Sequence, residues 1–204
     1  MHGDKKQERK KALEALTRHG IIEAAIGLLM RDGIQGLTME RVAAEAGVAK
    51  GTLYVYFKNK DEILDGAVEA SFDPLVGELS DLLDGGYAPD RKLAEFSLSH
   101  LRFFDEHGDL IRVLFYDRER MHSKKNHYAD TRYRTFVEQV AGVLDEGVGQ
   151  GLFVPLDSMK VAAMFIEANM GMVMQRIHDG ISGDIERDAR QITDLFMYGL
   201  KRSV

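Results

Sequence analysis

Residues 38–60, TMERVAAEAGVAKGTLYVYFKNK, contain the pattern on which the fold prediction rests. Two short segments of helical periodicity stand on either side of Gly47, with the small side chains of Ala43 and Ala46 where two helices would cross. Leu53 and Phe57 are four residues apart, so one helix can turn both inward. Together with a helix predicted before it, this stretch gives three short helices, the last two joined by a tight turn. That layout is typical of a helix-turn-helix.

A helix-turn-helix needs an outer face on its last helix that can enter the major groove of DNA. In residues 50–57, that face is left with Lys50, Gly51, Thr52 and Val55. An ammonium, a bare backbone, a hydroxyl and a methyl-bearing side chain suit contacts with base edges. The pattern therefore predicts a DNA-reading helix here.

The chain upstream of this motif supplies the first helix. Ile22, Ala25, Ile26 and Leu29 follow i, i+3, i+4, i+7 spacing, which predicts a helix over residues 12–32 that ends at Gly33. Five basic residues lie before it, within residues 5–11. We expect this segment to be a solvated, frayed terminus. The alternative is an arm that follows phosphates or enters a minor groove.

Helical periodicity also dominates the rest of the chain, so the sequence predicts an all-α fold. Pro74 should kink or break a long helix that starts after a capping box at Asn59 and Glu62. The glycine-rich segment 84–90 is the clearest loop. Further helices are expected over residues 90–107, 109–120, 127–150, 157–179 and 184–202. We predict two domains, a three-helix DNA-binding domain over residues 12–60 and a helical body over residues 61–204.

The charge of the chain is unevenly distributed between these parts. The net charge is −6, yet residues 1–60 hold 11 Lys and Arg against 7 Asp and Glu. This basic head on an acidic body favours a polyanion as partner for the head alone. Cysteine is absent, which excludes disulfides and thiolate chemistry. The polar start and the lack of a long apolar run lead us to expect a cytoplasmic protein with no membrane segment.

The string Ala46-Gly-Val-Ala-Lys-Gly-Thr-Leu-Tyr-Val-Tyr-Phe57, followed by Lys60, resembles the DNA-binding signature of the tetracycline-repressor (TetR) family. The likeness extends over about residues 15–65. It implies that Lys50 and Thr52 approach base edges, that Gly51 lets the backbone come close to DNA and that Val55 touches a thymine methyl. It also implies phosphate contacts by Thr38, Tyr54, Tyr56 and Lys60. Ala49 stands where the family often has Ser, and Val55 where it often has an aromatic residue, so the family's base preference does not carry over.

The same resemblance implies an effector pocket and a dimer interface in the body. A largely apolar pocket would suit an apolar or aromatic effector. Its candidate contacts are Phe104, Phe115, Tyr116 and Phe136, although aromatic residues at this spacing also suit an ordinary core. The last two helices would pair with those of a second copy in a four-helix bundle. The candidate dimer residues are Phe165, Ala168, Met172, Ile192, Leu195 and Phe196, which an intrachain core would equally explain.

The function predicted from the sequence is therefore that of a ligand-responsive regulator of transcription, a repressor released from a palindromic DNA operator by a small-molecule effector. We expect a homodimer with no catalytic residue, metal site or cofactor. Phosphate-loop, His-Glu-x-x-His and Gly-x-Ser-x-Gly motifs are absent from the sequence. The alternatives are a helical-bundle enzyme and, as a smaller variant, a metal-responsive regulator, since the chain has seven histidines.

Overall fold

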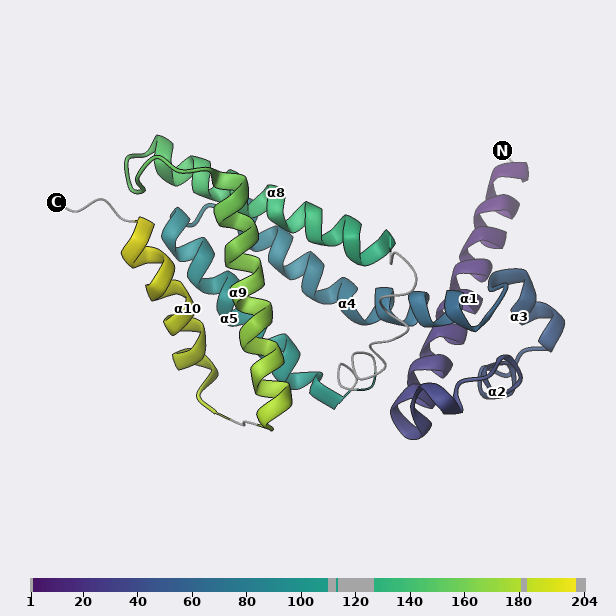
Figure 1. The fold of residues 1–204 in the computed structure, drawn as a ribbon. Helices are drawn as coiled ribbons and strands as arrows, with labels where there is room; N and C mark the ends of the chain where they lie inside the picture. Colours follow the sequence, from purple (N-terminus) through teal and green to yellow (C-terminus); the bar gives the residue numbers. More distant parts are fainter. Residues whose placement is uncertain (1, 110–112, 114–126, 181–182, 201–204) are drawn as a thin grey trace. The chain divides into compact units, whose positions relative to one another are not determined.

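The computed structural model describes residues 2–109, 113, 127–180 and 183–200. The chain forms two compact units, which divide between Phe72 and Asp73. Helices build both of them, so the predicted all-α fold is confirmed (Figure 1). The predicted helix over residues 109–120 lies almost entirely outside the described residues.

The first unit holds α1 (His2–Gly36), α2 (Met39–Glu45), α3 (Lys50–Tyr56) and the start of α4 (Lys60–Asp84). Its core joins one apolar face from each helix. The fully buried side chains at its centre are Ile21, Ala25, Leu29, Val42, Leu53 and Ile63. α1 and α4 approach closely at Gly66, where a Cβ atom would lie 2.7 Å from the Cδ1 atom of Ile22.

The beginning of α1 departs from the predicted bounds, because the helix starts at His2 rather than near residue 12. Residues 5–16 are all exposed, so packing does not explain these extra turns. Their composition does, since Lys, Arg, Glu, Ala and Leu are all strong helix formers. Ion pairs at i, i+4 spacing add to it, with Lys10 Nζ 3.7 Å from a carboxylate oxygen of Glu14. The end matches the expectation better, because Gly33 leaves helical geometry with φ of 64°.

α4 begins at the predicted capping box. The Asn59 side chain accepts from the Glu62 backbone N–H at 2.9 Å, and the Glu62 carboxylate accepts from the Lys58 N–H at 2.7 Å. The helix then continues through Pro74 to Asp84, so of the two expected outcomes, a kink or a break, the break does not occur. Neighbouring turns hold the helix together there, and only the N–H that proline lacks is lost.

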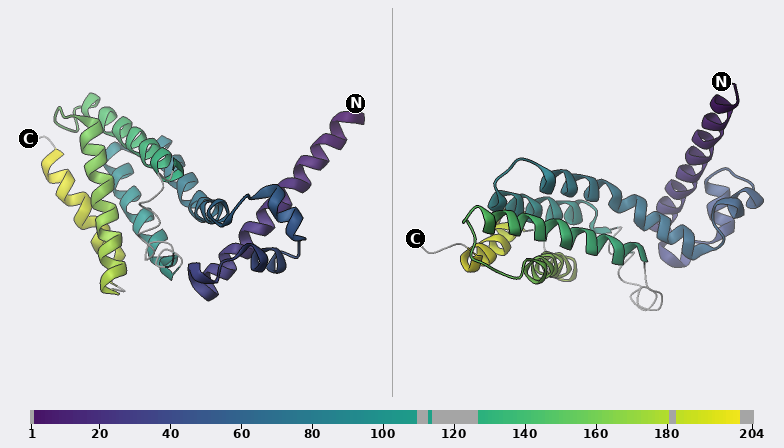
Figure 2. Two further views of the ribbon diagram at one scale, coloured as in Figure 1. Left: turned by 45° about the vertical axis from the view of Figure 1, so that its right-hand side comes forward. Right: turned by 90° about the horizontal axis from the view of Figure 1, so that it is seen from above.

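The second unit contains the remainder of α4, α5 (Pro89–Glu106), α8 (His127–Gly149), α9 (Ser158–Asp179) and α10 (Ile185–Leu200). α5 lies at its centre and packs against α8, α9 and α10, as the two views in Figure 2 also show. Aromatic rings fill the middle of the unit. The Phe96 ring lies 6.0 Å from Phe136 on α8 and 5.7 Å from Phe165 on α9, measured between ring centroids.

Candidate nucleic-acid interface

The turn between α2 and α3 depends on two local devices. Gly47 has φ of 66°, a left-handed conformation that glycine adopts at little cost, and the Val48 N–H donates to the Ala43 carbonyl at 3.0 Å. Thr38 caps α2, since its hydroxyl oxygen accepts from the Arg41 N–H at 3.2 Å. Leu53 and Phe57 are buried and fix α3 to the unit. The orientation of α3 is therefore set by a glycine turn on one side and an apolar anchor on the other.

The outer face of α3 is open to solvent. Lys50, Gly51 and Thr52 are exposed, and the side chains of Tyr54 and Val55 are 45% and 79% exposed. The fold buries little of the apolar surface of Val55, so this side chain is available for contact with another molecule. Tyr56 is half-buried. The structure thus leaves the predicted base-reading side chains accessible on one short helix.

Lys50 does not stand alone on this face. Its ammonium donates a hydrogen bond to the carboxylate of Glu40 on α2. The pair raises the pKa of Lys50 and lowers the pKa of Glu40, in both cases chiefly through this hydrogen bond. Glu40 was missed in the sequence because the two residues are ten positions apart on different helices. DNA that binds the Lys50 ammonium must compete with this carboxylate.

Two predicted phosphate contacts have roles within the free protein. The Thr38 hydroxyl oxygen caps α2, which still leaves its proton to donate to a phosphate. The Lys60 ammonium donates to the Ile34 carbonyl near the end of α1. Contacts of both residues with DNA remain predictions.

Further ion pairs stiffen the support of the helix-turn-helix. Arg41 bonds the Asp32 carboxylate and the Gly36 carbonyl, which ties α2 to the end of α1. Arg31 makes a two-pronged pair with Glu45, with both N···O distances at 3.0 Å. Planar guanidinium groups favour this geometry. The two ion pairs, Asp32–Arg41 and Arg31–Glu45, join residues 9 and 14 positions apart, beyond the reach of helical spacing rules.

The effector candidates in the second unit fall into two groups. Phe104 is buried on α5, and Phe136 is half-buried on α8 with its ring edge against Phe96. Phe115 and Tyr116 lie outside the described residues. The two described candidates belong to the aromatic centre of the unit, and their contact with an effector stays a prediction.

The dimer candidates on α9 and α10 face different ways. Phe165 and Ile192 are buried inside the protomer, where Phe165 packs against Phe96 and Phe196, so we assign both to the protomer core. Ala168, Met172 and Phe196 are half-buried. Leu195 is 73% exposed.

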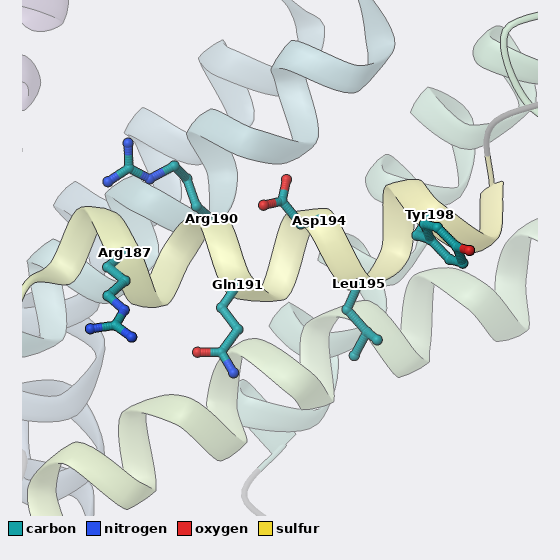
Figure 3. A pocket seen from close by; sticks show the side chains of 6 residues that line it. All are labelled: Arg187, Arg190, Gln191, Asp194, Leu195 and Tyr198. Atoms are coloured by element: carbon teal, nitrogen blue, oxygen red, sulfur yellow. The ribbon is translucent and has the colours of Figure 1, made fainter.

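An open hollow of about 680 Å³ runs along α10 beside Leu195. Figure 3 shows that its six lining side chains all come from this one helix. They are Arg187, Arg190, Gln191, Asp194, Leu195 and Tyr198.

The described residues hold neither a metal-binding cluster nor a membrane-spanning helix. No three His, Asp or Glu side chains among them come together in an arrangement that could hold a metal ion. Within the same residues, no helix is both long and apolar enough to cross a membrane.

Comparison with known proteins gives a consistent family. Residues 21–67 match the profile of bacterial regulatory proteins of the TetR family, and residues 86–176 match a tetracycline-repressor-like C-terminal domain. The repressor KstR2 of Mycolicibacterium smegmatis is 22% identical over 93% of each chain.

Solved structures agree with the profiles. A TetR regulator from Haloarcula marismortui superposes with a TM-score of 0.78 at 19% identity, covering 92% of this chain and all of the other. FadR of Bacillus subtilis, solved with stearoyl-CoA, gives a TM-score of 0.73 at 21% identity, covering 89% of this chain and 98% of the other. The two profiles, the exposed α3 face and the fold together show that the chain belongs to the TetR family of bacterial regulators, a family of DNA-binding proteins that control transcription in response to a ligand.

Proposed function

We propose that the protein is a homodimeric repressor that binds a palindromic operator through α3 and is released by an apolar effector. The observation that carries this proposal is the exposed face of α3, on which Lys50, Gly51, Thr52 and Val55 stand together above a buried anchor. Thr38, Tyr54, Tyr56 and Lys60 flank it as phosphate contacts, which position the protein on DNA without reading sequence.

A second copy of the chain is the partner we propose for α9 and α10. Leu195 and Tyr198 on α10 are 73% and 94% exposed, and Met164 on α9 is 63% exposed. Large apolar side chains at such exposure favour a protein interface. Two helices from each copy would form a four-helix bundle. A two-fold dimer matches the symmetry of a palindrome, whose half-sites lie about 34–36 Å apart.

The effector we propose is lipophilic and binds in the second unit. Its centre is built of aromatic side chains, among them Phe104 and Phe136, which suits an apolar ligand. The FadR structure described above contains stearoyl-CoA, a ligand with a long apolar chain. α4 belongs to both compact units, and we propose that it transmits the effect of the ligand to α3. Ligand and DNA must then weaken each other's binding by the same factor.

The proposal is tested by titrating the protein into a labelled duplex from the region upstream of its own gene, at several salt concentrations. We expect sequence-specific binding whose affinity falls steeply with salt. Lys50→Ala should lower specific affinity about 10-fold or more and reduce discrimination between sequences. Lys160→Ala is the matched control, because it removes an exposed ammonium from α9 in the second unit. Equal losses in both variants, or no binding to the duplex, would overturn the assignment of α3.

Release is tested on the preformed protein–DNA complex. Stearoyl-CoA is the first probe, with free coenzyme A as the control for its charged part. If the effector is an acyl-CoA, the acylated form alone should dissociate the complex; otherwise another lipophilic compound should do so. A complex that survives both stearoyl-CoA and a panel of other lipophilic compounds would contradict release by an apolar effector.

A further inference from the structure

Within the part of the chain that the structure describes, three polar atoms in the aromatic centre of the second unit are buried and have no hydrogen-bond partner. They are Ser97 Oγ and His100 Nδ1 on α5 and Asn169 Oδ1 on α9. Ser97 and Asn169 are completely buried, and His100 is 6% exposed. Folded proteins pair nearly all such atoms, because each unpaired one costs free energy. Three unpaired polar atoms in one region favour a binding site whose ligand supplies the missing hydrogen bonds.

The register of α5 against α9 brings His100 and Asn169 to the same level. Phe96 contacts Phe165, and further along the same two helices Arg176 bonds Asp105 at 2.8 Å, so α5 and α9 run in the same direction. His100 follows Phe96 by four residues, and Asn169 follows Phe165 by four. Residues four apart share a helix face, so both continue the Phe96–Phe165 interface one turn onward. Ser97 lies three residues before His100, which makes it a neighbour on α5.

The bonding capacity of these atoms defines what they can bind. The Asn169 amide NH₂ donates to the Phe165 carbonyl at 2.9 Å, and since a carbonyl only accepts, the remaining Asn169 oxygen must be the free atom. An amide oxygen accepts only, so its partner must carry an O–H or N–H. Ser97 can both donate and accept. A ligand hydroxyl, which also does both, complements the pair.

Charge in this region argues for a neutral ligand group. Burial lowers the pKa of His100 to about 4, so its imidazole is neutral near pH 7. Among the described residues of this unit, the buried cations Lys92 and Arg176 and the largely buried Arg132 each pair with a carboxylate of their own chain. We therefore expect none of the three to neutralise an anionic ligand.

We propose that Ser97, His100 and Asn169 form the polar recognition point for the effector, and that the effector is an apolar molecule carrying a hydroxyl group. Phe96 and Phe104 flank His100, with the His100 and Phe104 rings 4.8 Å apart, and provide the apolar surroundings. This inference rests on the proposed function, since it specifies the ligand of the effector site. It adds a class of ligand and three contacts that the aromatic residues alone do not indicate.

Binding is tested with two probes of matched shape, 4-octylphenol and 4-octylanisole, by calorimetry on the full chain. Only the phenol can donate a hydrogen bond. We expect the wild type to bind the phenol at least about 10-fold more tightly, because the ether leaves the Asn169 oxygen unpaired. Asn169→Leu should bring the ratio of the two affinities close to one. Thr193→Val is the control, because this buried hydroxyl on α10 already donates to the Ala189 carbonyl, and it should leave the ratio unchanged. Equal behaviour of the two probes on the wild type, including failure of both to bind, overturns the proposal.

Stability gives a second readout that needs no ligand. If Ser97 Oγ is unpaired in the free protein, Ser97→Ala should raise its Tm, since the substitution removes a buried polar atom without losing a hydrogen bond. Thr193→Val should lower Tm because it deletes a satisfied bond. Lower Tm in both variants would identify Ser97 as an ordinary structural group and overturn the proposal. DNA binding by these variants reports separately on the proposed function, which would survive that result.

Discussion

At the residue scale, the ammonium that is predicted to read DNA is already engaged by its own chain. Glu40 holds Lys50 in the free protein through a hydrogen bond between two exposed side chains. Such exposed pairs contribute little to stability, and salt screens them. The contact therefore matters more for binding than for folding, because DNA has to displace the Glu40 carboxylate and approach its negative charge.

Glu40→Gln should strengthen DNA binding. The substitution removes a negative charge from the DNA-facing surface and frees the Lys50 ammonium, so we expect affinity about 3- to 10-fold higher at low salt, with a smaller gain at high salt. Fluorescence anisotropy with a labelled operator measures this. Glu95→Gln is the control, since Glu95 forms a comparable exposed pair with Arg91 in the second unit. Unchanged or weaker binding by Glu40→Gln would show that the carboxylate does not compete with DNA.

His100 makes a measurable prediction about pH. Its pKa is about 4 in the folded protein, against about 6.5 when exposed in the unfolded chain, because burial disfavours the charged ring. The unfolded state therefore binds the proton first as pH falls. The contribution of neutral His100 to the free energy of unfolding is complete above pH 6.5 and is lost as pH falls toward 4. By pH 5, the loss amounts to roughly 2 kcal/mol.

Urea unfolding at pH 7 and pH 5 checks this dependence. In His100→Leu, which cannot titrate at this position, the loss of stability between the two pH values should be smaller by about that 2 kcal/mol. Identical losses in the wild type and the variant would place His100 in a solvated environment instead.

At the element scale, Arg176 is the side chain that joins three helices. From α9 it bonds Asp105 at the end of α5 and Asp188 near the start of α10, and it reaches the Gly183 carbonyl at 3.2 Å. The Arg176 side chain is only 6% exposed, whereas Asp105 remains 37% exposed. Burial raises the cost of breaking such a cluster, and the partial exposure of Asp105 limits it.

Arg176→Met should therefore destabilise the protein by about 2–3 kcal/mol, measured as the free energy of unfolding in urea, because it leaves two carboxylates without their cation. Arg102→Met is the matched control. Arg102 also links α5 to α10, through Glu186 at 3.3 Å, but both side chains are exposed. We expect a loss under about 1 kcal/mol there. Similar losses of unfolding free energy in the two variants would show that Arg176 stabilises the unit no more than an exposed ion pair does.

The sequence predicted most helices within a few residues, and the exceptions have physical causes. α8, α9 and α10 begin within one residue of their expected starts, because caps and apolar spacing are local signals. The early start of α1 was missed, since helix propensity extends it through residues that are exposed. At Pro74, where a kink or a break was expected, α4 continues without a break.

Packing at the end of α8 depends on a glycine. Gly147 lies inside α8, and a Cβ atom there would meet the Phe153 ring at 2.2 Å. It is required for close packing. Contacts of this kind, like the pairing of Glu40 with Lys50 or the burial of Phe165, join residues that no local spacing rule connects.

At the scale of the whole molecule, the proposed dimer is tested through the exposed face of α10. Leu195→Asp should convert the dimer to a monomer at micromolar concentrations, because it replaces an exposed apolar side chain of the proposed contact with a charge. Sedimentation velocity measures this, and operator affinity should fall with it. Leu152→Asp is the control, since Leu152 is also exposed but lies in the loop between α8 and α9. A dimer that persists in Leu195→Asp would move the interface elsewhere.

The Lys50–Glu40 pair has a consequence for the search along a chromosome. A bacterial genome offers millions of non-specific sites, and a Lys50 ammonium without a partner would dissociate slowly from the phosphates of each of them. We expect Lys50, which is already paired with Glu40, to bind random phosphates more weakly and to leave Glu40 only where a base edge offers a better hydrogen bond. The affinity for the operator would then be somewhat lower, while dissociation from all other sites would be faster.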